Sequence, residues 1–177
     1  MTNYLPEVIL TLSASFCLGL LNPASAQTTP SAADMVEQLK TQPPRTRSLR
    51  NLTVESAAPD GSVASKPSLS LLIQFDFNSS TVKPESQQAL ANLAQALKSK
   101  ELLESKFAVE GHTDGKGRAD YNLKLSQQRA DAVRSFLASN GVVDARLQAV
   151  GKGATELANT SDPLAAENRR VRIVNLN

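Results

Sequence analysis

The chain has 177 residues, 41% of them hydrophobic, and a formal net charge of +2 from 19 basic and 17 acidic side chains. This length suffices for one ordinary domain core with flanking segments. Because basic and acidic residues are interspersed along the sequence, we do not expect nucleic-acid binding. Aromatic residues make up 4% of the chain and Trp is absent, which also argues against a surface that stacks nucleic-acid bases.

The first 26 residues have the pattern of an export signal. Residues 8–21 are mostly apolar, and the small residues Ala24-Ser25-Ala26 precede an expected cleavage site at Gln27. The segment before the apolar run departs from the usual pattern, because it has no Lys or Arg and carries Glu7. An apolar run of about 14 residues is short for a bilayer span, so we predict cleavage, with a retained anchor as the alternative.

Residues 27–67 are rich in Ser, Thr, Pro and Ala, a composition that predicts a flexible tether. Within it, Met35, Val36 and Leu39 stand at helical spacing, enough for a marginal turn or two of helix. The basic segment RTRSLR at residues 45–50 has two interpretations: a solvated part of the tether, or a docking motif for another envelope protein.

Ordered structure is predicted to begin near Leu69, with a domain over residues 69–177. Apolar side chains alternate with others through residues 69–77, which predicts a strand with one buried face. Pro84 suits the first position of a helix whose inward stripe consists of Leu90, Leu93, Ala94 and Leu97.

A second strand is predicted through Phe107 and Val109, followed by a polar loop over residues 111–120. The helix after this loop is predicted to end at Gly141, a residue suited to a left-handed cap. Residues 147–150 and 170–176 are predicted as the third and fourth strands. Two amphipathic helices on one face of a small sheet bury both apolar stripes, so we predict an α+β two-layer sandwich.

One residue of the helix after the loop stands out of place. At 100° per residue, Arg129 falls among the apolar side chains, with Asn122 and Ser126 on the same side. A guanidinium on a face that should be buried is costly unless it is paired or hydrogen-bonded. Asp114, in the preceding loop, is the candidate partner for a structural ion pair, and the alternative is a bound anion.

The sequence around these residues resembles a known family. The motifs are EGHTDGKG at residues 110–117, YNLKLSQQRADAV at 121–133 and NRRV at 168–171. In this order they are similar to the peptidoglycan-binding domain at the C-terminus of outer membrane protein A, also found in the peptidoglycan-associated lipoprotein and flagellar stator B proteins. The resemblance covers residues 69–177, and it implies an α+β sandwich with a mixed sheet.

The resemblance also implies a ligand. In the family it is the diaminopimelate residue of peptidoglycan stem peptides, whose amino-acid head carries an ammonium and a carboxylate on one carbon. By position, Asp114 would hold the ammonium and Arg129 the carboxylate, which its planar fork suits. The implied function is non-covalent peptidoglycan binding that anchors or organises the Gram-negative cell envelope. The implied location is the periplasm, in association with the outer membrane.

Other positions match the lining of the family's pocket: Thr113, Asn122, Leu123, Asp76, Asn78, Arg169 and Arg170. From the residues alone, Asn122 could instead cap the helix and Asp76 could cap a turn. One of the two consecutive arginines is expected to face the ligand and the other to be solvated on the sheet. Leu164 and Ala165 stand where many relatives have Gly-Arg, which removes one cation from this part of the site.

Catalysis is not expected from these residues. His112 is the only histidine and the only cysteine, Cys17, lies in the predicted signal, which argues against Cys-His, Ser-His-Asp and multi-histidine zinc sites. Asp76 and Asp114 remain as a conceivable carboxylate pair, but Arg129 nearby opposes the raised pKa that a general acid needs. We predict a binding protein without metal or cofactor, whose partner is peptidoglycan; in the alternative interpretation of the tether, another envelope protein is a second partner.

Overall fold

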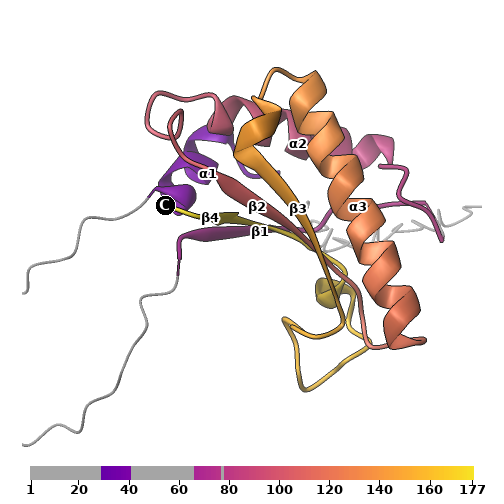
Figure 1. Cartoon of the computed structure of the whole chain (residues 1–177). Helices are drawn as coiled ribbons and strands as arrows, with labels where there is room; N and C mark the ends of the chain where they lie inside the picture. The colour runs from indigo at the N-terminus through magenta and orange to yellow at the C-terminus, as the bar shows by residue number, and fades with distance from the viewer. Residues whose placement is uncertain (1–28, 41–65, 77) are drawn as a thin grey trace, which may run out of the picture.

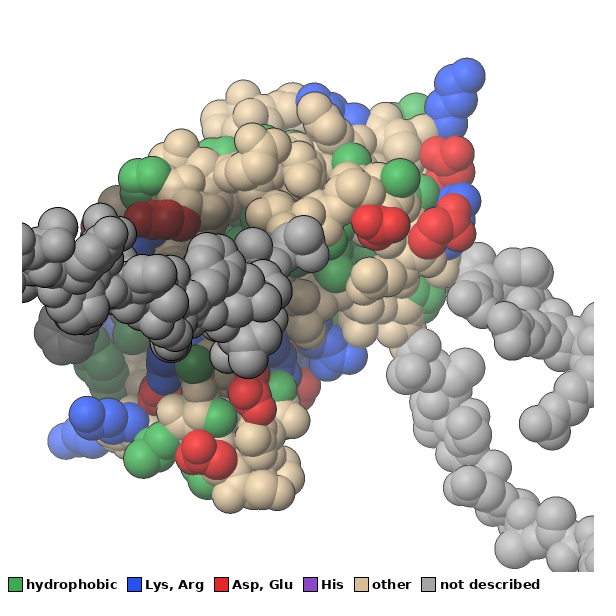
Figure 2. Space-filling model, turned by 180° about the vertical axis from the view of Figure 1, so that it is seen from behind, with side chains coloured by type: hydrophobic (Ala, Val, Ile, Leu, Met, Phe, Trp, Pro, Cys, Tyr) green, Lys and Arg blue, Asp and Glu red, His purple; other side chains and the backbone are tan. Residues whose placement is uncertain are grey.

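The computed structural model describes residues 29–40, 66–76 and 78–177. The predicted export signal and the RTRSLR segment lie outside the described residues, as does Phe77. None of the helices in the described part of the chain is both long and apolar enough to cross a membrane. On the face seen in Figure 2, basic and acidic side chains lie interspersed, in keeping with the small net charge.

Four strands form one mixed sheet in the order β1-β4-β2-β3. They are β1 (Ser68–Leu71), β2 (Phe107–His112), β3 (Leu147–Gly153) and β4 (Val171–Asn175). Strand β4 is antiparallel to both β1 and β2, and β2 is parallel to β3. The parallel pair is joined through a helix, which is the usual connection for parallel strands.

Three helices accompany the sheet (Figure 1): α1 (Ala32–Leu39), α2 (Pro84–Leu97) and α3 (Ala119–Ser139). The strand register places Leu69, Ile173, Val109 and Ala149 in one row across the sheet. Leu69, Ile173 and Val109 belong to the same core cluster as buried apolar side chains of all three helices, and Ala149 packs against this cluster. The predicted α+β sandwich with a mixed sheet is therefore confirmed.

Helix α3 lies directly on the strands that it connects. A Cβ atom added to Gly151 would stand 2.6 Å from the backbone nitrogen of Gln127, so only glycine fits at this point of β3. The buried side chains of α3 that face the sheet are correspondingly small or medium in size: Asn122, Ser126, Ala130, Val133 and Leu137. This close contact fixes the position of the functional residues that α3 carries.

Helix α1 differs from the predicted tether. It has eight residues, begins with a capping box between Ser31 and Asp34, and buries Met35 and Leu39 completely in the core. The side-chain amide of Asn175 donates a hydrogen bond to the Leu39 carbonyl at 2.9 Å. Tertiary burial stabilises a helix that would be marginal in isolation. Residues 32–39 therefore belong to the core, although we predicted that this region buries little.

The predicted element boundaries need smaller changes. The first strand ends at Leu71, and Phe75 is held instead by an isolated bridge to Val82. The third strand extends to Gly153, beyond the predicted end. Gly141 has a φ of 86° just after α3, in agreement with the predicted left-handed cap.

Candidate ligand-binding site

The loop between β2 and α3 is held by one buried amide. The side-chain nitrogen of Asn122 donates hydrogen bonds to the carbonyls of Lys116 at 3.0 Å and Asp114 at 3.4 Å. The backbone nitrogen of Gly115 also donates to the Pro163 carbonyl at 2.8 Å. The N-cap of α3 is Arg118, not Asn122. Asn122 therefore orders the loop that carries Asp114, and it does not cap the helix.

Arg129 extends from α3 and is partly buried. Its Nε donates to the Ser79 carbonyl at 3.1 Å, and its guanidinium lies 4.8 Å from the centroid of the Phe75 ring, within the range of a cation–π contact. Burial lowers the pKa of Arg129 below its usual value, and Arg169 lowers it further. Among the residues that the structure describes, no carboxylate forms an ion pair with Arg129.

Asp114 is paired with a different arginine from the one we predicted. Its Oδ2 accepts a hydrogen bond from Nη1 of Arg169 at 2.9 Å, and its Oδ1 accepts one from the backbone of Lys116 at 3.2 Å. The interpretation of Asp114 and Arg129 as a structural ion pair is therefore wrong. Asp114 still acts on Arg129 at longer range, since its charge raises the pKa of Arg129.

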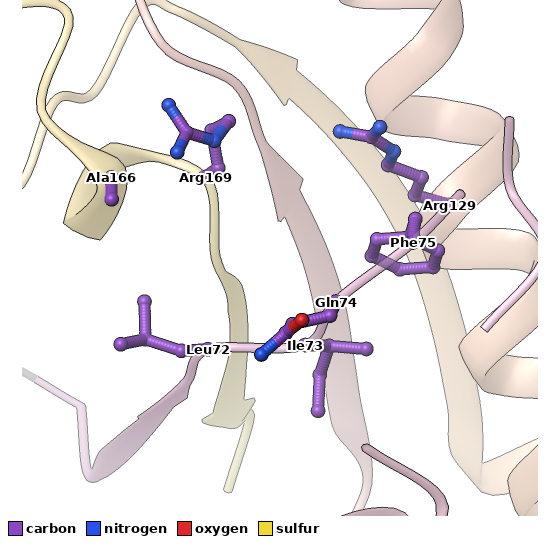
Figure 3. A pocket seen from close by; sticks show the side chains of 7 residues that line it. All are labelled: Leu72, Ile73, Gln74, Phe75, Arg129, Ala166 and Arg169. Atoms are coloured by element: carbon purple, nitrogen blue, oxygen red, sulfur yellow. The ribbon is translucent and has the colours of Figure 1, made fainter. Parts of the chain in front are cut away.

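Arg129 and Arg169 line one open pocket of about 380 Å³. Figure 3 shows the two side chains on either side of the cavity, with Phe75 beneath Arg129 and Leu72 and Gln74 across the lower part. Ile73 and Ala166 complete the lining. The pocket thus combines two cationic groups with an apolar base.

One side of this pocket is lined by residues that we did not predict as site residues. We expected Asp76 and Asn78, but both lie exposed in a turn beyond the pocket, where Asn78 has a φ of 52°. The lining comes instead from Leu72 to Phe75, just before the turn. The sequence could have indicated Leu72, because this leucine interrupts the alternation of the strand. In the structure its side chain is 52% exposed.

The two consecutive arginines have different environments. Arg169 reaches the pocket, whereas Arg170 is buried and donates from Nη2 to the Glu156 carbonyl at 3.0 Å. The prediction that one of the two faces the site agrees with this geometry, but the prediction that the other is solvated is wrong. Both arginines precede β4, which begins at Val171, and the hydrogen bond to Glu156 holds Arg170 away from solvent.

Two other predicted positions, Leu123 and Thr113, do not line the pocket of Arg129. Leu123 is 51% exposed and lines a separate, apolar pocket of about 300 Å³ with Lys152 and Thr155. Thr113 is buried, and its backbone nitrogen donates to the Gly153 carbonyl at 2.8 Å. Thr113 therefore supports the loop through its backbone, and Leu123 belongs to a different pocket.

His112 lies buried at the end of β2, beside Glu110 of the same strand. Burial lowers the pKa of His112 to about 4, and the charge of Arg170 contributes in the same direction. Both ring nitrogens lack a hydrogen-bond partner within the described part of the chain. The described part of the chain contains no group of His, Cys, Asp and Glu side chains that could hold a metal ion.

Relatives share this part of the chain. Residues 74–171 match the OmpA family. The peptidoglycan-associated lipoprotein of Pseudomonas aeruginosa is 35% identical over 67% of this chain and 71% of its own length. Outer membrane protein A of Bordetella avium is 42% identical over 56% of this chain and 51% of its own length. The chain thus spans only about half of this second relative.

Solved structures are also similar to this chain. The peptidoglycan-associated lipoprotein from Burkholderia pseudomallei superposes with a TM-score of 0.51 at 35% identity, covering 66% of this chain and 95% of that one. The periplasmic domain of Helicobacter pylori MotB superposes with a TM-score of 0.55 at 23% identity, covering 64% of this chain and 77% of that one. The second likeness concerns the fold alone. With more than half of its residues matched, this chain belongs to the OmpA family.

Proposed function

We propose that this protein binds peptidoglycan non-covalently through the diaminopimelate of a stem peptide, and that it thereby anchors or organises the Gram-negative cell envelope. One observation carries the proposal: Arg129 presents its guanidinium to a pocket without a carboxylate partner among the described residues. A partly buried cation of this kind is stabilised by a bound anion. Two relatives in this family are named peptidoglycan-associated lipoprotein.

The groups around the pocket suit a zwitterionic amino-acid head. Because Nε of Arg129 is engaged with Ser79, its two terminal nitrogens remain for a carboxylate, which guanidinium binds in a bidentate manner. Asp114, whose charge acts on Arg129 and which contacts Arg169 of the pocket, is the candidate site for an ammonium. Its carboxylate already meets Arg169, so a ligand ammonium would share this carboxylate with Arg169 and would not find it free.

The same charges argue for binding without catalysis. A general acid needs a carboxyl whose pKa is raised by burial or by a neighbouring negative charge. Asp114 contacts a cation instead, and Asp76 lies exposed in its turn. We propose the periplasm as the location, since that is where peptidoglycan is accessible to a protein associated with the outer membrane.

Sedimentation with purified sacculi tests the proposal. The full-length protein is expected to sediment with diaminopimelate-type sacculi, and Arg129→Gln and Asp114→Asn are expected to remain in the supernatant. Lys124→Gln is the matched control, because it removes the same charge from an exposed position on α3. If both site variants sediment as fully as the control, the proposed function is wrong.

A further inference from the structure

Within the part of the chain that the structure describes, both arginines of the pocket have a pair of donors without a hydrogen-bond partner. In Arg129, Nε is engaged with Ser79, so the terminal nitrogens Nη1 and Nη2 are available. In Arg169, Nη1 is engaged with Asp114 and, at 3.5 Å, with the Leu164 carbonyl, so Nε and Nη2 are available. Each available pair is an edge with two parallel N–H groups, the geometry that matches a carboxylate.

The charges of the site do not balance for a simple amino-acid head. Arg129 and Arg169 supply two positive charges, and Asp114 supplies one negative charge. A zwitterionic head adds one of each sign, so one positive charge remains uncompensated. Arg169 and Arg129 also repel each other, since Arg169 lowers the pKa of Arg129. A ligand with one further carboxylate removes this imbalance.

We propose that Arg169 binds a second carboxylate of the same stem peptide, namely the α-carboxylate of the glutamate that precedes diaminopimelate. This glutamate is linked through its side-chain carboxyl, which leaves its α-carboxylate ionised unless it is amidated. The site then recognises the unamidated stem peptide in preference to the amidated one. This inference rests on the proposed function, because it assumes that Arg129 holds the diaminopimelate carboxylate.

Apolar side chains of the same pocket suit the part of the ligand that joins the two carboxylates. Leu72, Ile73 and Ala166 line the pocket, and Figure 3 shows Leu72 and Ala166 on the side of Arg169. The diaminopimelate side chain and the glutamate linkage both contain methylene groups, which pack favourably on apolar side chains. Asp114 holds Arg169 in place through the ion pair at 2.9 Å, so the second carboxylate meets a guanidinium that is already oriented.

The test uses two synthetic peptides, L-Ala-γ-D-Glu-meso-diaminopimelate with the free α-carboxylate on glutamate and the same peptide amidated at that carboxylate. In both, the diaminopimelate carboxyl that normally continues the peptide is blocked as an amide. Titration calorimetry on the full-length protein is expected to show about 10-fold tighter binding of the acid, about 1.4 kcal/mol. Arg169→Gln is expected to bind the two peptides equally, at the affinity of the amidated one.

The outcomes separate this inference from the proposed function. If the unmodified protein binds both peptides with equal affinity, or if Arg169→Gln keeps the preference for the acid, the second-carboxylate site is wrong while peptidoglycan binding stands. If neither peptide binds the unmodified protein, the proposed function itself fails. Lys124→Gln controls for net charge and is expected to keep the full preference. Thermal unfolding of Arg169→Gln checks that the variant is folded.

Discussion

Two arginines in this molecule are partly buried beside a phenylalanine ring, yet their hydrogen bonds differ. Arg129 lies 4.8 Å from the ring of Phe75, and Arg146 lies 5.6 Å from the ring of Phe107. Burial is the leading cause that lowers the pKa of both. Hydrophobic surroundings and a cation–π contact therefore do not distinguish a structural arginine from a ligand-binding one.

The hydrogen bonds distinguish them. Arg146 donates to three backbone carbonyls, those of Ser105 at 2.8 Å, Leu97 at 3.0 Å and Leu102 at 2.6 Å. It thereby satisfies the carbonyl groups at the end of α2 and in the following turn, which have no helical partner. Among the described residues, Arg129 donates to one carbonyl and lines a pocket. We propose that the remaining donors of this partly buried guanidinium bind a ligand.

The largest effect is expected at Arg129. Arg129→Gln removes the bidentate edge, and we expect an affinity loss of about 100-fold for a diaminopimelate peptide, about 3 kcal/mol for two charge-assisted hydrogen bonds. Arg146→Gln, at the other partly buried arginine, is expected to leave the affinity unchanged once the variant is folded. Titration calorimetry on both variants checks the contrast, and equal losses would remove it.

The reverse contrast is expected for stability. Arg146→Gln removes the guanidinium donors of the Ser105 and Leu97 carbonyls, while the Leu102 carbonyl keeps the backbone N–H of Ser105. We expect the free energy of unfolding to fall by about 2 kcal/mol. Arg129→Gln loses one hydrogen bond and relieves an uncompensated cation, so its change is expected to stay below about 1 kcal/mol. Urea unfolding at neutral pH measures both values, and a larger destabilisation by Arg129→Gln would assign that residue a structural role.

A lysine at each position gives a finer comparison. Arg129→Lys keeps the charge but loses the planar fork, so we expect an affinity loss of about 10-fold, intermediate between the unmodified protein and Arg129→Gln. Arg146→Lys cannot reach three carbonyls with one ammonium and is expected to destabilise by about 1 kcal/mol. If Arg129→Lys binds as tightly as the unmodified protein, charge alone determines recognition.

The last prediction concerns pH. The pKa of His112 is lowered to about 4 in the folded chain from an ordinary value near 6.5, so the unfolded chain binds its proton first as the pH falls. Stability is therefore expected to be complete above pH 6.5 and to decline as the pH falls towards 4. The charged groups that influence this histidine lie on β2, β3 and β4 and just outside these strands: Glu110, Lys152, Glu156, Arg170 and Arg172. Urea unfolding between pH 7 and 4, with His112→Gln as the variant that lacks the effect, measures it. An identical decline in both proteins would place its cause elsewhere.

The sequence revealed Arg129 because a helical wheel needs only the spacing of residues within one element. The partner of Asp114 could not be found in this way, because Arg169 is 55 positions away and meets Asp114 only through the order of the strands. The family resemblance placed Arg169 and Arg170 at the site without separating them, because both precede β4, where no strand alternation could assign their directions.

The buried faces of α2 and β1 were easier to predict than those of α3 and α1. The apolar stripes of α2 and the alternation in β1 identified their buried faces. For α3, the helical wheel placed Asn122 and Ser126 on the apolar side, and both are buried, whereas Leu123 is exposed. The close approach of α3 to Gly151 selects small side chains over large apolar ones. For α1, intrinsic helix stability gave no sign that tertiary contacts would bury Met35 and Leu39.

A crystal structure of the full-length protein with a diaminopimelate stem peptide tests the central claim most directly. We expect one ligand carboxylate within about 3 Å of both terminal nitrogens of Arg129 and the ligand ammonium at Asp114, in the pocket shared with Arg169. A ligand bound elsewhere, for example in the apolar pocket beside Leu123, with Arg129 not in contact with it, would contradict this account.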